Sequence, residues 1–271
     1  MNTLMNFKNT WLTAAFVLVF HAICGLSKAT GGEGMPGEFT HAGLRKVLAT
    51  HASTNGVNYA ALKADPAELN AYLDECSHVT KSRFEAWPKA AQLAFLVNLY
   101  NATTLRLVAK HYPVSSIRQI GGLLGNPWKL KEVRIHGDLM TLDELEHDVI
   151  RKRYAEPRIH FAVVCAAKGC PTLRLEPYEG EKLDLQLEDQ ARGFMATAEK
   201  NRLDASRKTL WLSPIFDWYR SDFEAAAGTL QSYVQPRLPE DKAKLLLNST
   251  WKIRFTTYDW SLNDWKPLRK R

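Results

Sequence analysis

The chain of 271 residues is long enough for one domain with a real core, and its formal net charge of +7 is a modest basic excess. No Arg-Gly repeat and no pattern of base-stacking aromatic residues accompanies this excess, so we exclude a nucleic-acid partner. A mildly basic surface of this kind is either simply solvated or favours contact with an anionic surface such as lipid headgroups or cell-wall polymers.

The first 29 residues have the features of a secretory signal peptide. Lys8 precedes an apolar run over residues 11–26, and the small residues Ser27 and Ala29 follow where a signal peptidase cleaves. The apolar run is short and ends at this cleavage site, so it does not make a stable membrane anchor. We therefore expect a periplasmic or secreted protein that has no stable membrane anchor after cleavage.

Three cysteines remain after cleavage, namely Cys76, Cys165 and Cys170. An odd number leaves at least one thiol free or paired between chains, and an export compartment permits disulfides. The short interval from Cys165 to Cys170 is compatible with a local disulfide. No second pair of Cys or His residues has the spacing of zinc ligands, so we expect no metal site and no cofactor.

Residues 30–83 are predicted to form an N-terminal helical extension. Helices are expected over residues 39–48 and 66–75, with an extended segment over residues 57–64 between them. Cys76 lies near the end of the second helix on an apolar stripe, which is typical of a structural free cysteine.

The strongest helix is predicted over residues 87–110, with Pro88 in its first turn and Pro113 past its end. It is apolar on nearly all sides, which indicates a buried central helix. Asn98 and Asn101 interrupt it on one ridge. Buried amides need partners, so these side chains either bind neighbouring backbone or orient a site.

A hairpin is expected over residues 131–140, and the capping box of Thr141 and Glu144 then starts a helix that reaches about Tyr154. Glu146 falls on the apolar face of this helix. A buried carboxylate is costly unless it is paired, so Glu146 is either a partner of Arg153 or Arg158 or a carboxylate of a site.

Residues 158–171 hold a histidine and two cysteines. Residues 158–165 are predicted to be a strand buried on both faces, followed by a turn. In a regular strand, His160 and Cys165 point to opposite faces, whereas Cys170 lies past the turn and is free to fold back over His160. A bulge would instead bring Cys165 to His160. The alternative is that all three residues are structural.

The rest of the chain is predicted to form a small sheet and further helices. Helices are expected over residues 183–200, 214–223, 225–234 and 240–247, and strands over residues 209–212 and 251–257. Together with the central helix, these elements define an α+β fold. We expect a single domain with a buried central helix, a small mostly antiparallel sheet and surrounding helices.

Five motifs occur in order: AFLVNLYNA, LDELEHDVIR, RIHFAVVCAAKGCP, LSPIFDWYRSDF and YDWSLND. Together they resemble the domain-of-unknown-function 547 family, over residues 84–271. The resemblance implies a single α+β domain that is often exported in bacteria, and it supplies no reaction. It brings together a set of polar residues without assigning roles to them. These are Asn98, Asn101, Glu146, Arg151, His160, Cys165 and Asp259.

Two functions follow as hypotheses. The first is a thiol-dependent hydrolase or transferase, with Cys165 or Cys170 as nucleophile, His160 as base and Glu146 or Asp259 as the orienting carboxylate. Its substrate would be an unknown small molecule or peptide, bound by the polar residues Asn98, Asn101 and Arg151. A papain-like protease is not expected, because that fold places its cysteine on a helix upstream of the histidine. The second is a non-catalytic periplasmic module that binds a ligand or a protein.

Overall fold

The helix α5 (Lys89–His111) lies at the centre of the fold and nearly all of its residues are buried, which confirms the predicted central helix. The computed structural model describes residues 38–122 and 125–265, all of which belong to one compact unit. The expected signal peptide lies outside the described residues. In that described part, no helix is both long enough and apolar enough to cross a membrane.

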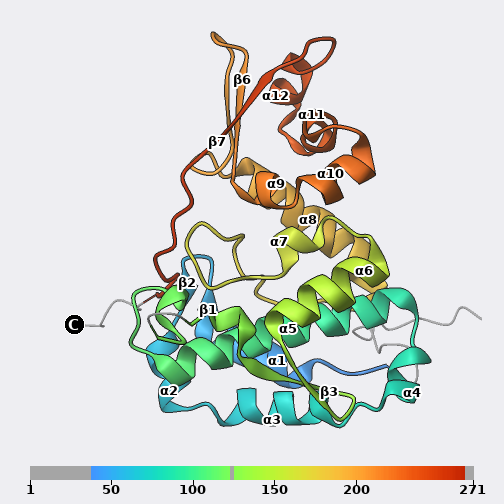
Figure 1. Cartoon of the computed structure of the whole chain (residues 1–271), viewed down its shortest axis with the longest axis vertical. Coiled ribbons are helices and arrows are strands. Elements are labelled where there is room, and N and C mark those ends of the chain that lie inside the picture. Colours follow the sequence, from blue (N-terminus) through green and yellow to red (C-terminus); the bar gives the residue numbers. More distant parts are fainter. Residues whose placement is uncertain (1–37, 123–124, 266–271) are drawn as a thin grey trace, which may run out of the picture. The chain divides into compact units, whose positions relative to one another are not determined.

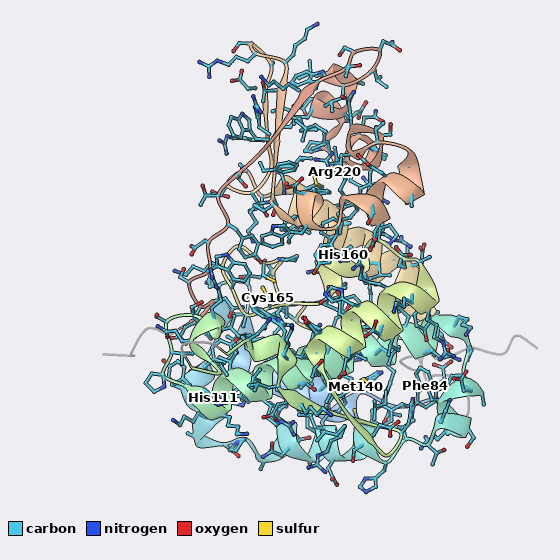
Figure 2. All side chains as sticks on the ribbon, viewed as in Figure 1. Phe84, His111, Met140, His160, Cys165 and Arg220 are labelled. Carbon is cyan, nitrogen blue, oxygen red and sulfur yellow. The ribbon has the colours of Figure 1, made fainter. Side chains whose placement is uncertain are left out.

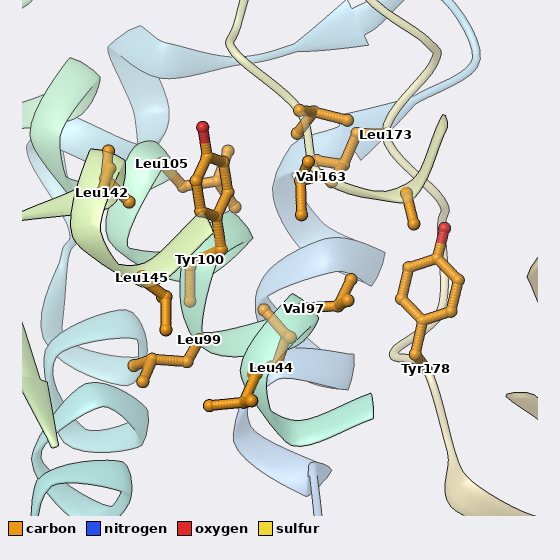
Figure 3. Packing of buried hydrophobic residues seen from close by; sticks show 14 of the residues in the cluster. Leu44, Val97, Leu99, Tyr100, Leu105, Leu142, Leu145, Val163, Leu173 and Tyr178 are labelled. Atoms are coloured by element: carbon orange, nitrogen blue, oxygen red, sulfur yellow. The ribbon is translucent and has the colours of Figure 1, made fainter. Parts of the chain in front are cut away.

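Four helices of the N-terminal part share one hydrophobic core with α5 (Figure 1). They are α1 (Ala42–His51), α2 (Tyr59–Ala64), α3 (Ala67–Ser77) and α4 (Lys81–Glu85). Figure 3 shows Leu44 of α1 close to Val97 and Leu99 of α5. The segment expected to be an extension therefore packs directly on the central helix.

The extended segment expected at residues 57–64 is wrong for most of its length. Only Gly56–Val57 is a strand, β2, which pairs with β1 (Ala52–Ser53), and α2 begins directly afterwards. The Asn58 side chain accepts a hydrogen bond of 3.1 Å from the Ala61 N–H. Asn is a favoured N-cap, so it starts a helix at this point.

The predicted hairpin is confirmed as β3 (Lys131–Ile135) and β4 (Asp138–Thr141). His136 and Gly137 form its turn, both with positive φ. The capping box follows as predicted, because the Glu144 N–H donates to Thr141 Oγ1 and the Thr141 N–H donates to the Glu144 carboxylate. The helix it starts is a π-helix, η3 (Glu144–Ile150), continued by α6 (Arg151–Tyr154).

A second hydrophobic core gathers aromatic side chains that include Phe161, Phe216 and Phe223. Its elements carry the chain from residue 183 to residue 255: α8 (Leu183–Ala196), β5 (Arg202–Asp204), β6 (Thr209–Leu212), α9 (Ile215–Trp218), α10 (Arg220–Ala227), α11 (Leu230–Val234), α12 (Glu240–Leu245) and β7 (Lys252–Phe255). The fold is therefore α+β, as expected. The strands that the structure describes form three small sheets, antiparallel except for the parallel pair β6–β7.

Four short 3-10 helices complete the described elements, namely η1 (Ile117–Gln119), η2 (Pro127–Lys129), η4 (Gly180–Lys182) and η5 (Gln235–Arg237). One of them, η2, begins at a proline, and the Asn126 side chain caps it by accepting a hydrogen bond from the Trp128 N–H. This cap fixes the backbone at Trp128, whose side chain reaches the candidate site described below.

The strand expected at residues 158–165 is wrong. The structure has a short helix here, α7 (Ile159–Ala162), and the chain becomes extended only at Val163. Its side chains enter both cores, Ile159 and Ala162 the first and Phe161 the second, and this burial overrides the strand preference of Ile, Phe and Val. His160 and Cys165 are therefore not held on opposite faces of a strand.

Candidate functional site

A pocket of about 190 Å³ lies where the two hydrophobic cores meet, and it collects side chains from elements far apart in the sequence. Figure 2 shows His160 and Cys165 in this region of the fold. The described residues that line the pocket are Tyr100, Trp128, Asp143, Glu146, His147, His160, Val163, Cys165, Cys170, Ile215, Trp218, Tyr219, Tyr258 and Trp260. Four of the five residues predicted to be catalytic are therefore brought together.

The two cysteines of the pocket are free thiols in direct contact. The Cys165 thiol donates to Cys170 Sγ over 3.0 Å, and the Cys165 N–H donates to the same sulfur over 2.9 Å. The Tyr258 hydroxyl lies 3.2 Å from Cys165 Sγ. Cys170 Sγ is thus the atom on which hydrogen-bond donors converge, and a thiolate is the form that such donors stabilise.

The pKa values of the two thiols move in opposite directions. Burial raises the pKa of Cys170, but the donors from Cys165 and Tyr258 and the nearby Lys200 ammonium outweigh it, so that the pKa is lowered. The pKa of Cys165 is raised well above its ordinary value, first by its hydrogen bond to Cys170 and then by burial. Of the two thiols, Cys170 is therefore the one that loses its proton more readily.

The loop that carries the cysteines is held by the C-terminal segment. The N–H groups of Lys168 and Gly169 donate to the carbonyls of Ser261 and Asp259, over 2.9 and 2.8 Å. A Cβ on Gly169 would lie 2.9 Å from the Asp259 nitrogen and 3.0 Å from the Tyr258 ring. Only glycine permits this approach, which places Tyr258 against the thiols.

His160 is fully buried on α7, with its ring stacked on Tyr219 at a centroid distance of 3.7 Å. Its Nε2 lies 2.8 Å from Asp222 Oδ2, and its Nδ1 has no partner among the described residues. A carboxylate only accepts, so Nε2 carries the proton and Nδ1 keeps a lone pair. Burial lowers the pKa of His160, although Asp222 opposes this, which favours the neutral ring.

Asp222 and Tyr219 are site residues that the sequence reasoning missed. Asp222 accepts from Nε and Nη2 of Arg151, both over 2.8 Å, as well as from His160. These bonds, that of His160 first, hold the pKa of Asp222 far below its usual range. A usable signal was present, since Tyr219 and Asp222 are three residues apart in a motif with aromatic neighbours. Arg151 was expected to bind substrate, but its guanidinium forms an ion pair with Asp222.

Glu146 is buried, as its helical phase predicts, with 6% of its surface exposed. Its expected pairing with Arg153 or Arg158 is wrong. The Tyr219 hydroxyl donates to Glu146 Oε1 over 2.7 Å, whereas Arg153 pairs with Glu85 and Arg158 pairs with Glu156 and Asp184. The partner lies 73 residues away, beyond any local pattern.

Asn98 and Asn101 are not among the lining residues, and both bind backbone. Asn101 donates to the Ala162 carbonyl and accepts from the Val164 N–H, each over 2.9 Å. Asn98 makes the same pair of bonds with the backbone of Tyr178, over 2.8 and 2.9 Å. Each amide therefore fastens a chain segment to α5, and Asn101 fastens the segment that leads to Cys165.

Asp259 does not line the pocket, although its neighbours Tyr258 and Trp260 do. It is exposed, and its carboxylate accepts from the N–H of Ser261 over 2.9 Å. Cys76 is buried in the first core, and burial raises its pKa to about 12. Within residues 38–122 and 125–265, no group of three or more His, Cys, Asp or Glu side chains is arranged to hold a metal ion.

Residues 84–195 match a family model described as "Protein of unknown function, DUF547". This match covers part of the chain and confirms the resemblance noted in the sequence. It includes His160, both pocket cysteines and Glu146, while Tyr219, Asp222 and Tyr258 lie beyond it. Neither curated proteins nor solved structures gave a match to this chain.

Proposed function

We propose that the protein is an exported thiol-dependent hydrolase or transferase whose nucleophile is Cys170, acting on a small molecule or peptide. The observation that carries the proposal is the contact of the two thiols inside a pocket that His160 also lines. The sulfur of Cys170 receives two hydrogen bonds from Cys165, and its lowered pKa favours the reactive thiolate.

The proposed reaction is acyl transfer. The Cys170 thiolate forms a bond to the carbonyl carbon of the substrate, and the leaving group departs with the electrons of its bond to that carbon and takes up a proton from solvent water. Water or another acceptor then attacks the thioester, loses its proton and regenerates the thiolate. The proposed acceptor of that proton is Nδ1 of His160, which has a free lone pair in a ring that lines the pocket, although the atom itself is enclosed in this structure.

Asp222 is a positioning residue in this proposal. It holds the His160 proton on Nε2 and is itself fixed by two bonds from Arg151. Stacking on Tyr219 sets the plane of the His160 ring. Support for the alternative, a non-catalytic binding module, comes from Asn98 and Asn101, because both amides are used to hold the fold.

An activated ester tests the reaction. We expect p-nitrophenyl acetate to release a burst of nitrophenol close to one equivalent, and to leave one acetyl group on the peptide that contains Cys170. Cys170→Ser should abolish the burst, whereas Cys76→Ser, which removes a core thiol, should not. Acetylation of lysines alone, with the same burst in Cys170→Ser, would exclude the thiol mechanism and leave the binding module.

A further inference from the structure

The pocket has an electrostatic character opposite to that of the whole chain. The chain has 36 Lys and Arg residues against 29 Asp and Glu residues. Among the described residues that line the pocket there is no Lys or Arg, but there are two acids, Asp143 and Glu146. The lining also contains two histidines, which add no positive charge in their neutral form. The two carboxylates therefore give the wall a negative character.

Glu146 has an oxygen available for a ligand. Its Oε1 accepts from the Tyr219 hydroxyl, while its Oε2 has no hydrogen bond from any described residue. Oε2 is not among the fully enclosed unpaired atoms either, and Glu146 is a lining residue of the pocket. A buried carboxylate with no cationic partner favours a cation placed beside it.

Aromatic rings form the rest of this wall. Trp218 and Trp260 stack at a centroid distance of 5.8 Å, and Tyr258 lies 4.8 and 4.6 Å from their centroids. Trp218 remains 49% exposed, which is unusual for so large an apolar side chain. The faces of such rings attract cations, and Arg118 already stands over Trp260 at 5.2 Å.

Three basic side chains that contact lining residues of the pocket have other partners. Arg151 contacts the Tyr219 ring, but its guanidinium is bound to Asp222. Lys200 donates to the Cys170 carbonyl, and Arg118 covers Trp260. Neither Arg151, Lys200 nor Arg118 lines the pocket, so the charge of Glu146 and the exposed ring of Trp218 remain for a ligand.

We propose that the pocket binds an organic ammonium group, and that the substrate carries such a group next to the bond that Cys170 attacks. The identification as a substrate rests on the proposed function, whereas the binding of the ammonium group does not. Glu146 would supply the counter-charge, and the exposed face of Trp218 would supply the cation–π contact.

Calorimetric titration of the chain with choline tests the binding. We expect saturable binding that is about tenfold tighter than that of the uncharged analogue in which tert-butyl replaces trimethylammonium. Ethanolamine should also bind, because its ammonium N–H groups can donate hydrogen bonds to the Glu146 carboxylate. Glu146→Gln keeps an oxygen for Tyr219 and should weaken choline binding about tenfold. Asp148→Asn removes an equal charge from an exposed position of the same helix and should change nothing.

Trp218→Ala provides a second variant, because half of this side chain is exposed and its loss should not unfold the protein. It should weaken choline binding by a similar factor. Equal binding of choline and the uncharged analogue, or unchanged binding in Glu146→Gln, would overturn the proposal. Reactive thiols without choline binding would refute this inference alone, and choline binding with inert thiols would refute only the proposed reaction.

Discussion

Cys170→Ser should slow the alkylation of this protein by iodoacetamide at neutral pH by at least about tenfold, whereas Cys165→Ser should leave most of the reactivity. The thiolate is the species that reacts, and among the cysteines that the structure describes only Cys170 has a lowered pKa. Serine at position 165 keeps both an O–H and an N–H donor for the Cys170 sulfur. In Cys170→Ser, the remaining Cys165 thiol is still subject to burial, which raises its pKa.

Two further variants control for the source of the reactivity. Cys76→Ser should be indistinguishable from the parent chain, because the pKa of Cys76 is raised to about 12. Tyr258→Phe removes a donor to the thiol pair and should shift the pH profile of alkylation upward. Labelling is located by peptide mass mapping. Preferential labelling of Cys165 in the parent chain, at the same rate in Cys170→Ser, would contradict the assignment of the lower pKa to Cys170.

Asn101→Ala should lower the free energy of unfolding by about 2 to 6 kcal/mol, measured by urea denaturation. The change leaves the Ala162 carbonyl and the Val164 N–H without their buried partner, and each unmet group costs about 1–3 kcal/mol. Because Val164 precedes Cys165, the folded variant should also alkylate at an altered rate.

Asn98→Ala is the matched comparison for this prediction. It removes the equivalent two bonds to Tyr178 and should destabilise the protein to a similar extent. Its thiol reactivity should match that of the parent chain, because Tyr178 does not line the pocket. Full stability in both alanine variants would show that the amides do not fasten these segments.

Local patterns predicted the parts of the fold that local forces determine. The apolar helix α5, the turn at His136 and Gly137, and the capping box of Thr141 and Glu144 all depend on residues close in sequence. The burial of Glu146 followed from helical periodicity in the same way, although this helix is a π-helix in the structure.

Long-range packing determined what the sequence reasoning missed. The run of Ile, Phe and Val in residues 159–164 resembles a strand, yet α7 forms because its side chains are divided between two cores. The partner of His160 is Asp222, which lies 62 residues away. The partner of Glu146 is Tyr219, which lies 73 residues away. Pairings at such separations follow from the packing of α9 and α10, which periodicity alone does not specify.

The most direct test of the thiolate assignment is a titration of thiolate ultraviolet absorbance against pH, in the parent chain and in Cys170→Ser. We expect the parent chain to contain a thiol whose pKa is lower than that of an ordinary cysteine, and we expect this ionisation to be absent from Cys170→Ser. The raised pKa of Cys165 predicts no second ionisation in that range. A parent chain in which no thiol ionises below the pKa of an ordinary cysteine, or a variant that keeps the early ionisation, would contradict the assignment.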